Sequence, residues 1–168
     1  YALNPEVVSD FSTAAAEGMT DGGIKPIAKH FPGIGYANAD PHGQLVRVSD
    51  LNALKQRELL PFRAAIDAGV PAIMTTHAVI PDVTDGEPVT MSPAGVALLR
   101  DDLGFSGLIV TDSLIMGAIA DDRSQSEAAV QALVAGNDVA LIAGAQNVGD
   151  VHAALVAAVA AGTISEER

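Results

Sequence analysis

The sequence predicts an α/β fold in which short parallel strands alternate with helices. Strand-like runs stand at 24–31, 70–75, 107–111 and 139–143, and helix caps or helical periodicity mark the segments between them. In the third run, the residues from Gly107 to Val110 are all apolar or small. Both faces of this strand are therefore expected to be buried, as in a parallel sheet covered by helices. Alternation of this kind favours a parallel sheet with right-handed crossovers.

A helix is expected before the first strand, because Asn4 can cap its N-terminus and Pro5 suits the first helical position. An apolar stripe extends this helix to about Thr20. After the strand 24–31, the stretch 31–50 is rich in Gly, Pro, Asn and Asp, and it shows too little periodicity for an element of its own. Loops of this length are usually functional or disordered.

The next two helices also begin at capping residues. Asp50 can cap a helix that Pro61 is expected to kink or split and that ends at Gly69. Ser92 and Pro93 start another helix, for which Gly104 is the expected left-handed terminator.

Beyond the strand 107–111, Ser124 and Glu127 fit a capping box at the start of a helix that stops at Gly136. The strand 139–143 follows. Apolar residues between 151 and 159 recur at helical spacing and predict an amphipathic helix. Four strand and helix units fit either a small doubly wound sheet or half of a (β/α)₈ barrel, which typically needs about 250 residues. The pattern by itself favours the open sheet.

Composition limits the possible partners and cofactors. The 168 residues carry a formal net charge of −12, with 21 acidic and 9 basic side chains. This balance argues against binding to nucleic acid or to an anionic membrane surface, since phosphate contacts need clustered Lys and Arg. The absence of cysteine excludes disulfides, thiolate metal sites and cysteine nucleophiles. No apolar run reaches the roughly 18 residues of a membrane span, no signal peptide is visible, and the compartment stays open.

Asp112 is the principal candidate for a reactive group, because it directly follows a buried strand and ligands of α/β folds bind at the carboxyl ends of strands. An Asp in this position can also simply cap a helix or mark the exit into water. The apolar run before it also fits the magnesium-holding strand of nucleotide hydrolases, but the chain has no G-x-x-x-x-G-K-[ST] loop.

The segment 98–116 contains two leucines, a base, two acids, L-G-F-S-G, three aliphatic residues, Thr and Asp. It closely resembles the active-site signature of glycoside hydrolase family 3, in which the Asp after Ser or Thr is the catalytic nucleophile. The resemblance implies that role for Asp112. It also implies a (β/α)₈ TIM-barrel-type catalytic domain, of which residues 1–168 would be the C-terminal half, a single partial domain truncated at both ends that lacks the upstream part of the barrel.

A second segment, 29–35, reads K-H-F-P-G-I-G and is followed by Asp40, Pro41 and His42. It resembles the β-N-acetylglucosaminidase branch of that family, whose D-x-H pair is an acid/base dyad. The resemblance implies that His42 is the general acid/base with Asp40 as its orienting partner. It further implies that Lys29 and His30 contact substrate.

Three residues depart from the pattern of that branch. Ile34 stands where the branch usually has His, Pro41 replaces the middle Ser of the dyad, and Ser113 replaces the second Asp of the commoner S-D-D. None of these departures removes a residue to which the resemblance gives a chemical role.

The resemblance therefore implies a retaining exo-β-N-acetylglucosaminidase that needs no cofactor and removes terminal GlcNAc from cell-wall muropeptides or chitin-type oligomers. A histidine with a pKa near 6.5 suits both giving and taking a proton. Alternatives are a GlcNAc phosphorylase or a β-glucosidase of the same family, and a non-catalytic α/β fragment or carbohydrate-binding remnant. His77 is read as a core histidine bonded to backbone rather than a wall of the site. The histidines show no spacing typical of metal ligands.

Overall fold

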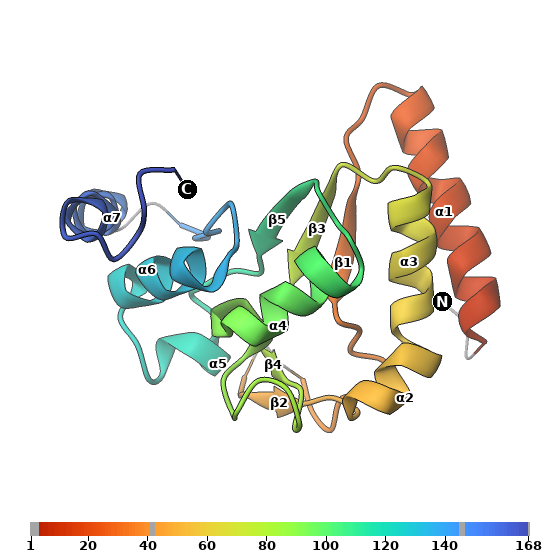
Figure 1. Cartoon of the computed structure of the whole chain (residues 1–168), viewed down its shortest axis with the longest axis horizontal. Helices are drawn as coiled ribbons and strands as arrows, with labels where there is room; N and C mark the ends of the chain where they lie inside the picture. The colour runs from red at the N-terminus through yellow and green to blue at the C-terminus, as the bar shows by residue number, and fades with distance from the viewer. Residues whose placement is uncertain (1–3, 41–42, 145–146, 168) are drawn as a thin grey trace.

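The computed structural model describes residues 4–40, 43–144 and 147–167. Its main sheet has three parallel strands in the order β1 (Ile27–Phe31), β3 (Ala72–Thr75) and β5 (Leu108–Thr111) (Figure 1). Beyond β5, a parallel bridge joins Val110 to Val139. The strands thus follow one another in chain order with no reversal, whereas a doubly wound sheet reverses its order at a switch point. The predicted α/β fold with four units of a TIM-barrel-type domain is confirmed.

The fourth predicted strand, 139–143, is shorter than expected. It contributes the single bridge at Val139, although Leu114 N still donates to Leu141 O at 2.9 Å. One reason is a side chain in the ladder: the backbone N–H of Leu141 donates to Thr111 Oγ1 at 2.8 Å. A hydroxyl takes the place of the Thr111 backbone carbonyl that would accept this N–H if the parallel strand continued beyond Val139.

The stretch 31–50 was expected to hold no element, and this is wrong for two residues. Strand β2 (Val46–Arg47) pairs in parallel with β4 (Ala78–Val79), which follows β3 closely. Val46 and Ala78 are fully buried. A two-residue strand shows no period in the sequence, and its partner lies more than thirty residues away.

The helix beginning at Leu51 is split, but upstream of Pro61. It forms α2 (Leu51–Gln56) and α3 (Leu59–Asp67), and Pro61 lies in the first turn of α3. Proline has no N–H to donate to the carbonyl four residues earlier, which belongs to Arg57. The break therefore falls at Arg57, where the helical hydrogen bond is lost.

The remaining helices include two short elements that the sequence did not predict, the 3₁₀ turn η1 and the helix α5, and the last turn of the helix predicted from Ser92 takes a π-helical form, η2. Ser124 and Glu127 form the predicted capping box, and Gly136 ends α6 with a φ of +115°. The set is α1 (Pro5–Asp21), η1 (Val89–Met91), α4 (Pro93–Ala97), η2 (Leu98–Asp102), α5 (Gly117–Ala120), α6 (Gln125–Ala135) and α7 (Val148–Ala160).

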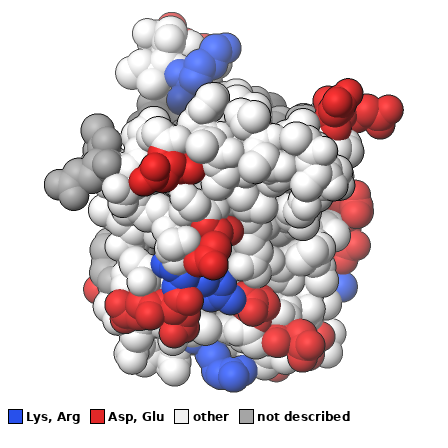
Figure 2. Space-filling model, turned by 90° about the vertical axis from the view of Figure 1, so that its left-hand side faces the viewer, with Lys and Arg blue, Asp and Glu red and all other residues white. Residues whose placement is uncertain are grey.

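The larger core cluster lies between the sheet and the helices α3 and α4. Phe31 and Phe62 meet edge to face there, with ring centroids 5.3 Å apart. Helix α1 packs against α3 but buries none of its residues fully, and Phe11 on it is 69% exposed. On the side where α6 and α7 lie, acidic side chains predominate among the charged ones (Figure 2). No helix in the described part of the chain is long and apolar enough to cross a membrane.

Candidate active site

Asp112 lies at the carboxyl end of β5, as predicted, and its carboxylate is held in place by backbone. Its own N–H donates to Thr75 O on β3 at 2.9 Å. Its Oδ1 accepts from the N–H of Ser113 at 2.8 Å. The other oxygen, Oδ2, lies 3.7 Å from His30 Nε2, and the side chains are 17% and 26% exposed respectively. Asp112 is therefore oriented on one oxygen, and the other oxygen faces a side chain of β1.

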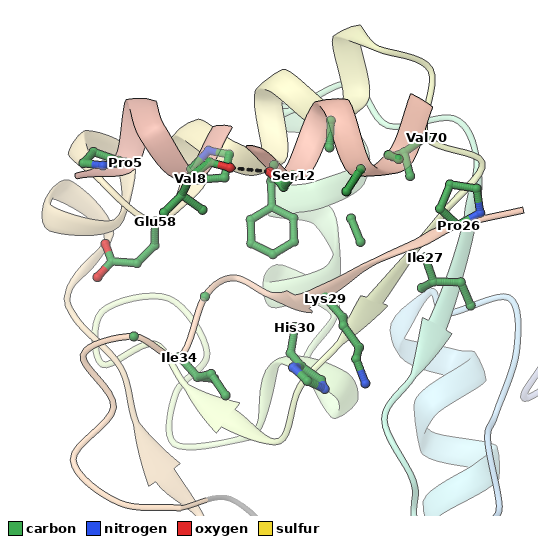
Figure 3. Close-up of a pocket in the computed structure, with 18 of the residues that line it drawn as sticks. Pro5, Val8, Ser12, Pro26, Ile27, Lys29, His30, Ile34, Glu58 and Val70 are labelled. Atoms are coloured by element: carbon green, nitrogen blue, oxygen red, sulfur yellow. Dashed lines mark hydrogen bonds between the residues drawn. The ribbon is translucent and has the colours of Figure 1, made fainter. Parts of the chain in front are cut away.

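Lys29 and His30 lie on β1, where the register with β3 shifts between Lys29 and Phe31. The Lys29–His30 and Phe31–Pro32 peptide bonds are both cis. Figure 3 shows Lys29 and His30 leaving β1 on the side away from α1. His30 is half-buried and Lys29 is exposed. The structure thus brings His30 next to Asp112 and places Lys29 one residue earlier on the same strand.

A cavity of about 580 Å³ lies between α1, β1 and α3. Lys29 and His30 are among its lining residues, with apolar side chains such as Val8 and Val70 (Figure 3). Asp112 is not among the described residues that line it. The cavity belongs mainly to the helical layer and is not the site around Asp112.

Asp40 is exposed in the loop between β1 and β2, whereas Pro41 and His42 lie outside the described residues. The geometry of the predicted dyad is therefore not tested. Two hydrogen bonds tie the loop just before Asp40 to β2: Asn38 Oδ1 accepts from Arg47 N at 2.8 Å, and Asn38 N donates to Arg47 O at 3.2 Å. Since β2 pairs with β4, the loop is anchored beyond the carboxyl end of β3.

His77 is a core histidine bonded to backbone, as the sequence indicated. It is fully buried, its Nδ1 is 2.9 Å from Thr90 Oγ1, and its Nε2 is 2.9 Å from the carbonyl oxygen of Ser113. Burial lowers the pKa of His77, against the opposing effects of its bond to Ser113 and of the Asp112 charge. The sequence did not predict that His77 is connected to Asp112 through Ser113. The signal that could have indicated it is the position of His77 two residues after the predicted strand 70–75.

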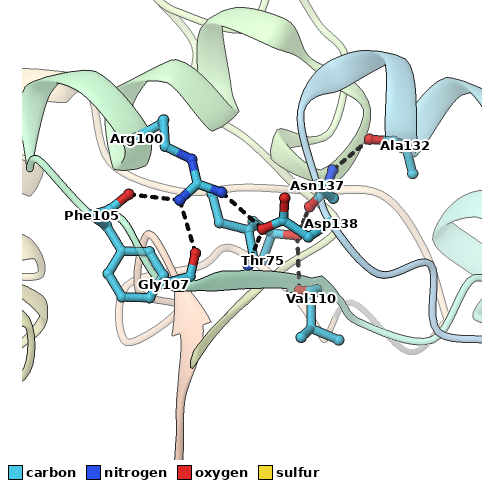
Figure 4. A network of polar contacts seen from close by, with 9 residues as sticks. Thr75, Arg100, Phe105, Gly107, Val110, Ala132, Asn137 and Asp138 are labelled. Atoms are coloured by element: carbon cyan, nitrogen blue, oxygen red, sulfur yellow. Dashed lines mark hydrogen bonds and ion pairs between the residues drawn. The ribbon is translucent and has the colours of Figure 1, made fainter. Parts of the chain in front are cut away.

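The other residues of the segment 98–116 support β5 from its opposite end (Figure 4). Arg100 Nη1 donates to the carbonyl oxygens of Phe105 and Gly107 at 2.7 and 2.8 Å, and its Nη2 meets Asp138 Oδ2 at 2.8 Å. Gly104 ends the preceding turn with a φ of +69°. These residues set where β5 begins, and the strand then carries Asp112 to the site.

A metal centre finds no support among the described residues, in which no three His, Asp or Glu side chains are grouped so as to hold an ion. At this end of the sheet the described residues supply the carboxylate of Asp112 and, 3.7 Å away, the imidazole of His30.

The whole chain, residues 1–168, matches the family model described as Glycosyl hydrolase family 3 N terminal domain. Beta-hexosaminidase LpqI of Mycobacterium tuberculosis is 35% identical to it over 147 residues, which cover 84% of this chain and 38% of that protein. A Beta-hexosaminidase of Neisseria meningitidis serogroup B is 36% identical over 146 residues, covering 84% of this chain and 40% of that protein. The chain thus spans about two fifths of the length of these curated relatives.

Solved structures agree. A glycoside hydrolase family 3 beta-N-acetylglucosaminidase from Paenibacillus sp. superposes with a TM-score of 0.94 at 40% identity, over 98% of this chain and 32% of that one. The structure of M. tuberculosis LpqI superposes with a TM-score of 0.92 at 33% identity, over 98% of this chain and 50% of that one. The match over all 168 residues, together with the strand order and the position of Asp112, shows that this chain belongs to glycosyl hydrolase family 3.

Proposed function

We propose that the protein containing this chain is a retaining exo-β-N-acetylglucosaminidase, and that Asp112 is its nucleophile. The observation that carries the proposal is the Asp112 carboxylate at the end of β5, held on Oδ1 by Ser113 N–H while Oδ2 stays partly exposed beside His30. A nucleophilic carboxylate needs this combination of fixed orientation and access. Relatives named beta-hexosaminidase and beta-N-acetylglucosaminidase support the choice of sugar.

In the proposed reaction an Asp112 oxygen attacks the anomeric carbon of a terminal GlcNAc, and the bond from that carbon to the leaving oxygen breaks. His42 gives its proton to the leaving oxygen, and Asp40 keeps the imidazole oriented. His42 then takes a proton from water as the water cleaves the glycosyl-enzyme, which restores Asp112 and retains the configuration. Lys29 and His30 bind hydroxyl groups of the sugar. Muropeptide or chitin-type oligomers are the substrates.

The decisive experiment is turnover of aryl β-GlcNAc substrates by the complete gene product. Asp112→Asn should lower kcat by roughly 10⁴-fold or more, since the attacking group is lost. Asp67→Asn, at an exposed position on α3, is the matched control and should turn over normally. Activity of Asp112→Asn within a few-fold of the wild type would contradict the assignment.

The role of His42 is tested with leaving groups of different basicity. His42→Ala should slow poor leaving groups far more than dinitrophenolate, which departs without protonation. Equal losses across the series would contradict the acid role. Running the same assays with and without inorganic phosphate separates hydrolysis from phosphorolysis, and comparing aryl glucosides with aryl GlcNAc substrates tests the β-glucosidase alternative.

A further inference from the structure

A buried histidine that the proposed reaction does not use lies directly behind the nucleophile. His77 follows β3, has no exposed surface, and reaches across to the residue after Asp112. Its two ring nitrogens have partners on different elements, Thr90 in η1 and the backbone of Ser113 beyond β5. The His77 ring therefore connects the end of β3, the end of β5 and the turn η1 beneath the proposed site.

The partners determine which ring nitrogen carries the proton. The carbonyl oxygen of Ser113 can only accept, so Nε2 of His77 has to be the donor across their 2.9 Å contact. In the neutral ring Nδ1 is then an acceptor, and it faces the hydroxyl of Thr90 at 2.9 Å. That hydroxyl also lies 2.8 Å from the carbonyl oxygen of Thr76, so its one proton serves either acceptor.

Ser113 transmits this contact to the nucleophile. Its carbonyl accepts from His77 Nε2 at 2.9 Å and from Met116 N at 3.1 Å, its N–H donates to Asp112 Oδ1 at 2.8 Å, and its Oγ accepts from Ala143 N at 3.3 Å. Both backbone groups of this residue are therefore engaged, one with the buried histidine and the other with the nucleophile. A rotation of the 113 backbone would move the donor that orients Asp112.

We propose that His77 is a positioning residue for Asp112, acting through its Nε2–H bond to the Ser113 carbonyl and the Ser113 N–H bond to Oδ1. The proposal rests on the proposed function, because Asp112 has to be the nucleophile for its orientation to matter. An exposed carboxylate on a strand end turns freely about its side-chain bonds, and misplacement of a reacting group by about 1 Å can cost about 100-fold in rate. His77 itself contacts neither the reacting carbon nor the leaving group.

Two substitutions separate the contact of His77 with Ser113 from its contact with Thr90. The side-chain amide of His77→Gln reaches as far as Nε2 and can donate to Ser113, whereas that of His77→Asn reaches only as far as Nδ1. We expect the kcat of His77→Gln on aryl GlcNAc substrates to stay within about 3-fold of the wild type, and that of His77→Asn to fall by about 30- to 100-fold. The inhibition constant of free GlcNAc should stay within about 2-fold in both variants, since ground-state binding does not use Asp112 orientation.

The same pair of changes at His152, which is exposed on α7, is the matched control and should leave kcat unchanged. Equal kcat values for folded His77→Gln and His77→Asn would overturn the positioning role while leaving the proposed function intact. Wild-type protein without GlcNAc-releasing activity, or active Asp112→Asn, would instead remove the proposed function and this proposal with it.

A measurement on the wild type covers the case in which His77→Asn does not fold. Long-range ¹H–¹⁵N spectra of the histidine rings, with His77→Gln used to assign the signal, report which ring nitrogen is protonated. We expect the Nε2–H tautomer for His77 at neutral pH. A ring protonated on Nδ1 alone could not donate to the Ser113 carbonyl, which would then keep only the N–H of Met116 at 3.1 Å, and would overturn the proposal.

Discussion

Replacing Arg100 by Met tests whether the start of β5 depends on one guanidinium group. Arg100 Nη1 donates to two backbone carbonyls, those of Phe105 and Gly107, and Nη2 pairs with Asp138. Met keeps most of the aliphatic stem, so the change removes the polar contacts with little loss of packing. It leaves both carbonyls without this donor and Asp138 without its cation.

The magnitude follows from these three contacts. A hydrogen bond to a charged group contributes about 1.5 to 3 kcal/mol, and because the Arg100 side chain is 30% exposed we expect about 1 to 1.5 kcal/mol from each of its two bonds to carbonyls. The ion pair with Asp138 adds less than about 1 kcal/mol, because the two side chains are 30% and 26% exposed and solvent screens the pair. We therefore expect Arg100→Met to lower the free energy of unfolding by about 2 to 4 kcal/mol.

Urea unfolding of the complete gene product, followed by circular dichroism, measures this loss. Arg63→Met, at an exposed position on α3, is the control and should change the unfolding free energy by less than about 0.5 kcal/mol. Arg100→Lys should recover only part of the loss, because an ammonium group lacks the planar fork that reaches several acceptors. A loss for Arg100→Met no larger than that for Arg63→Met would refute the reasoning.

Two further predictions concern stability. Gly107→Ala should destabilise the protein by about 1 to 3 kcal/mol, since the added Cβ would lie 2.6 Å from the ring of Phe105 and 2.6 Å from the carbonyl oxygen of Pro71. Gly149→Ala, which has open space around the added Cβ, is the control and should not destabilise the protein. Equal unfolding free energies for the two variants would contradict this prediction. Burial lowers the pKa of His77, so its contribution to stability is complete above the unfolded pKa of about 6.5 and is lost as pH falls toward the folded value. The stability difference between wild type and His77→Gln should therefore shift against the wild type below pH 6.5 in urea titrations, and a difference independent of pH would exclude that linkage.

The segment 98–116 shows how a sequence signature divides between chemistry and support. Asp112 is the residue with a proposed chemical role, and its place after an apolar strand was visible in the sequence. Arg100 and Gly107 have no such role in the structure: one binds backbone carbonyls, and the other leaves no room for a side chain. Sequence alone indicated that these residues belong to the pattern, but not what they do, because their partners include Asp138 in the loop after α6 and Pro71 just before β3.

Local signals predicted the helix starts well. Asn4, Asp50, Ser92 and Ser124 all cap helices with their side chains, as predicted. Each cap depends on residues no more than four positions away, so the sequence contains all that decides it. The two-residue strands and the shortened fourth strand were not predicted, because they depend on partners far along the chain.

The choice between an open sheet and a barrel shows the same division. Four strand and helix units were evident from the sequence, but their pattern fits both architectures. The order β1, β3, β5 and then Val139, with no reversal, separates the two, and strand order is a property of long-range pairing. The resemblance to glycoside hydrolase family 3 predicted the barrel from the sequence, whereas hydrophobic periodicity did not.

By itself, the sequence determined the alternation of strands and helices, the helix caps, and the position of Asp112 after an apolar strand, since each of these follows from residues close together in the chain. The expected burial of both faces of that strand is wrong, because Leu108 on β5 is 54% exposed. Only the tertiary structure decided that His30 comes within 3.7 Å of Asp112, and that His77 binds the residue after it. Those contacts join β1, β3 and β5, whose residues are 36 to 82 positions apart, and parallel pairing brings their carboxyl ends to one edge.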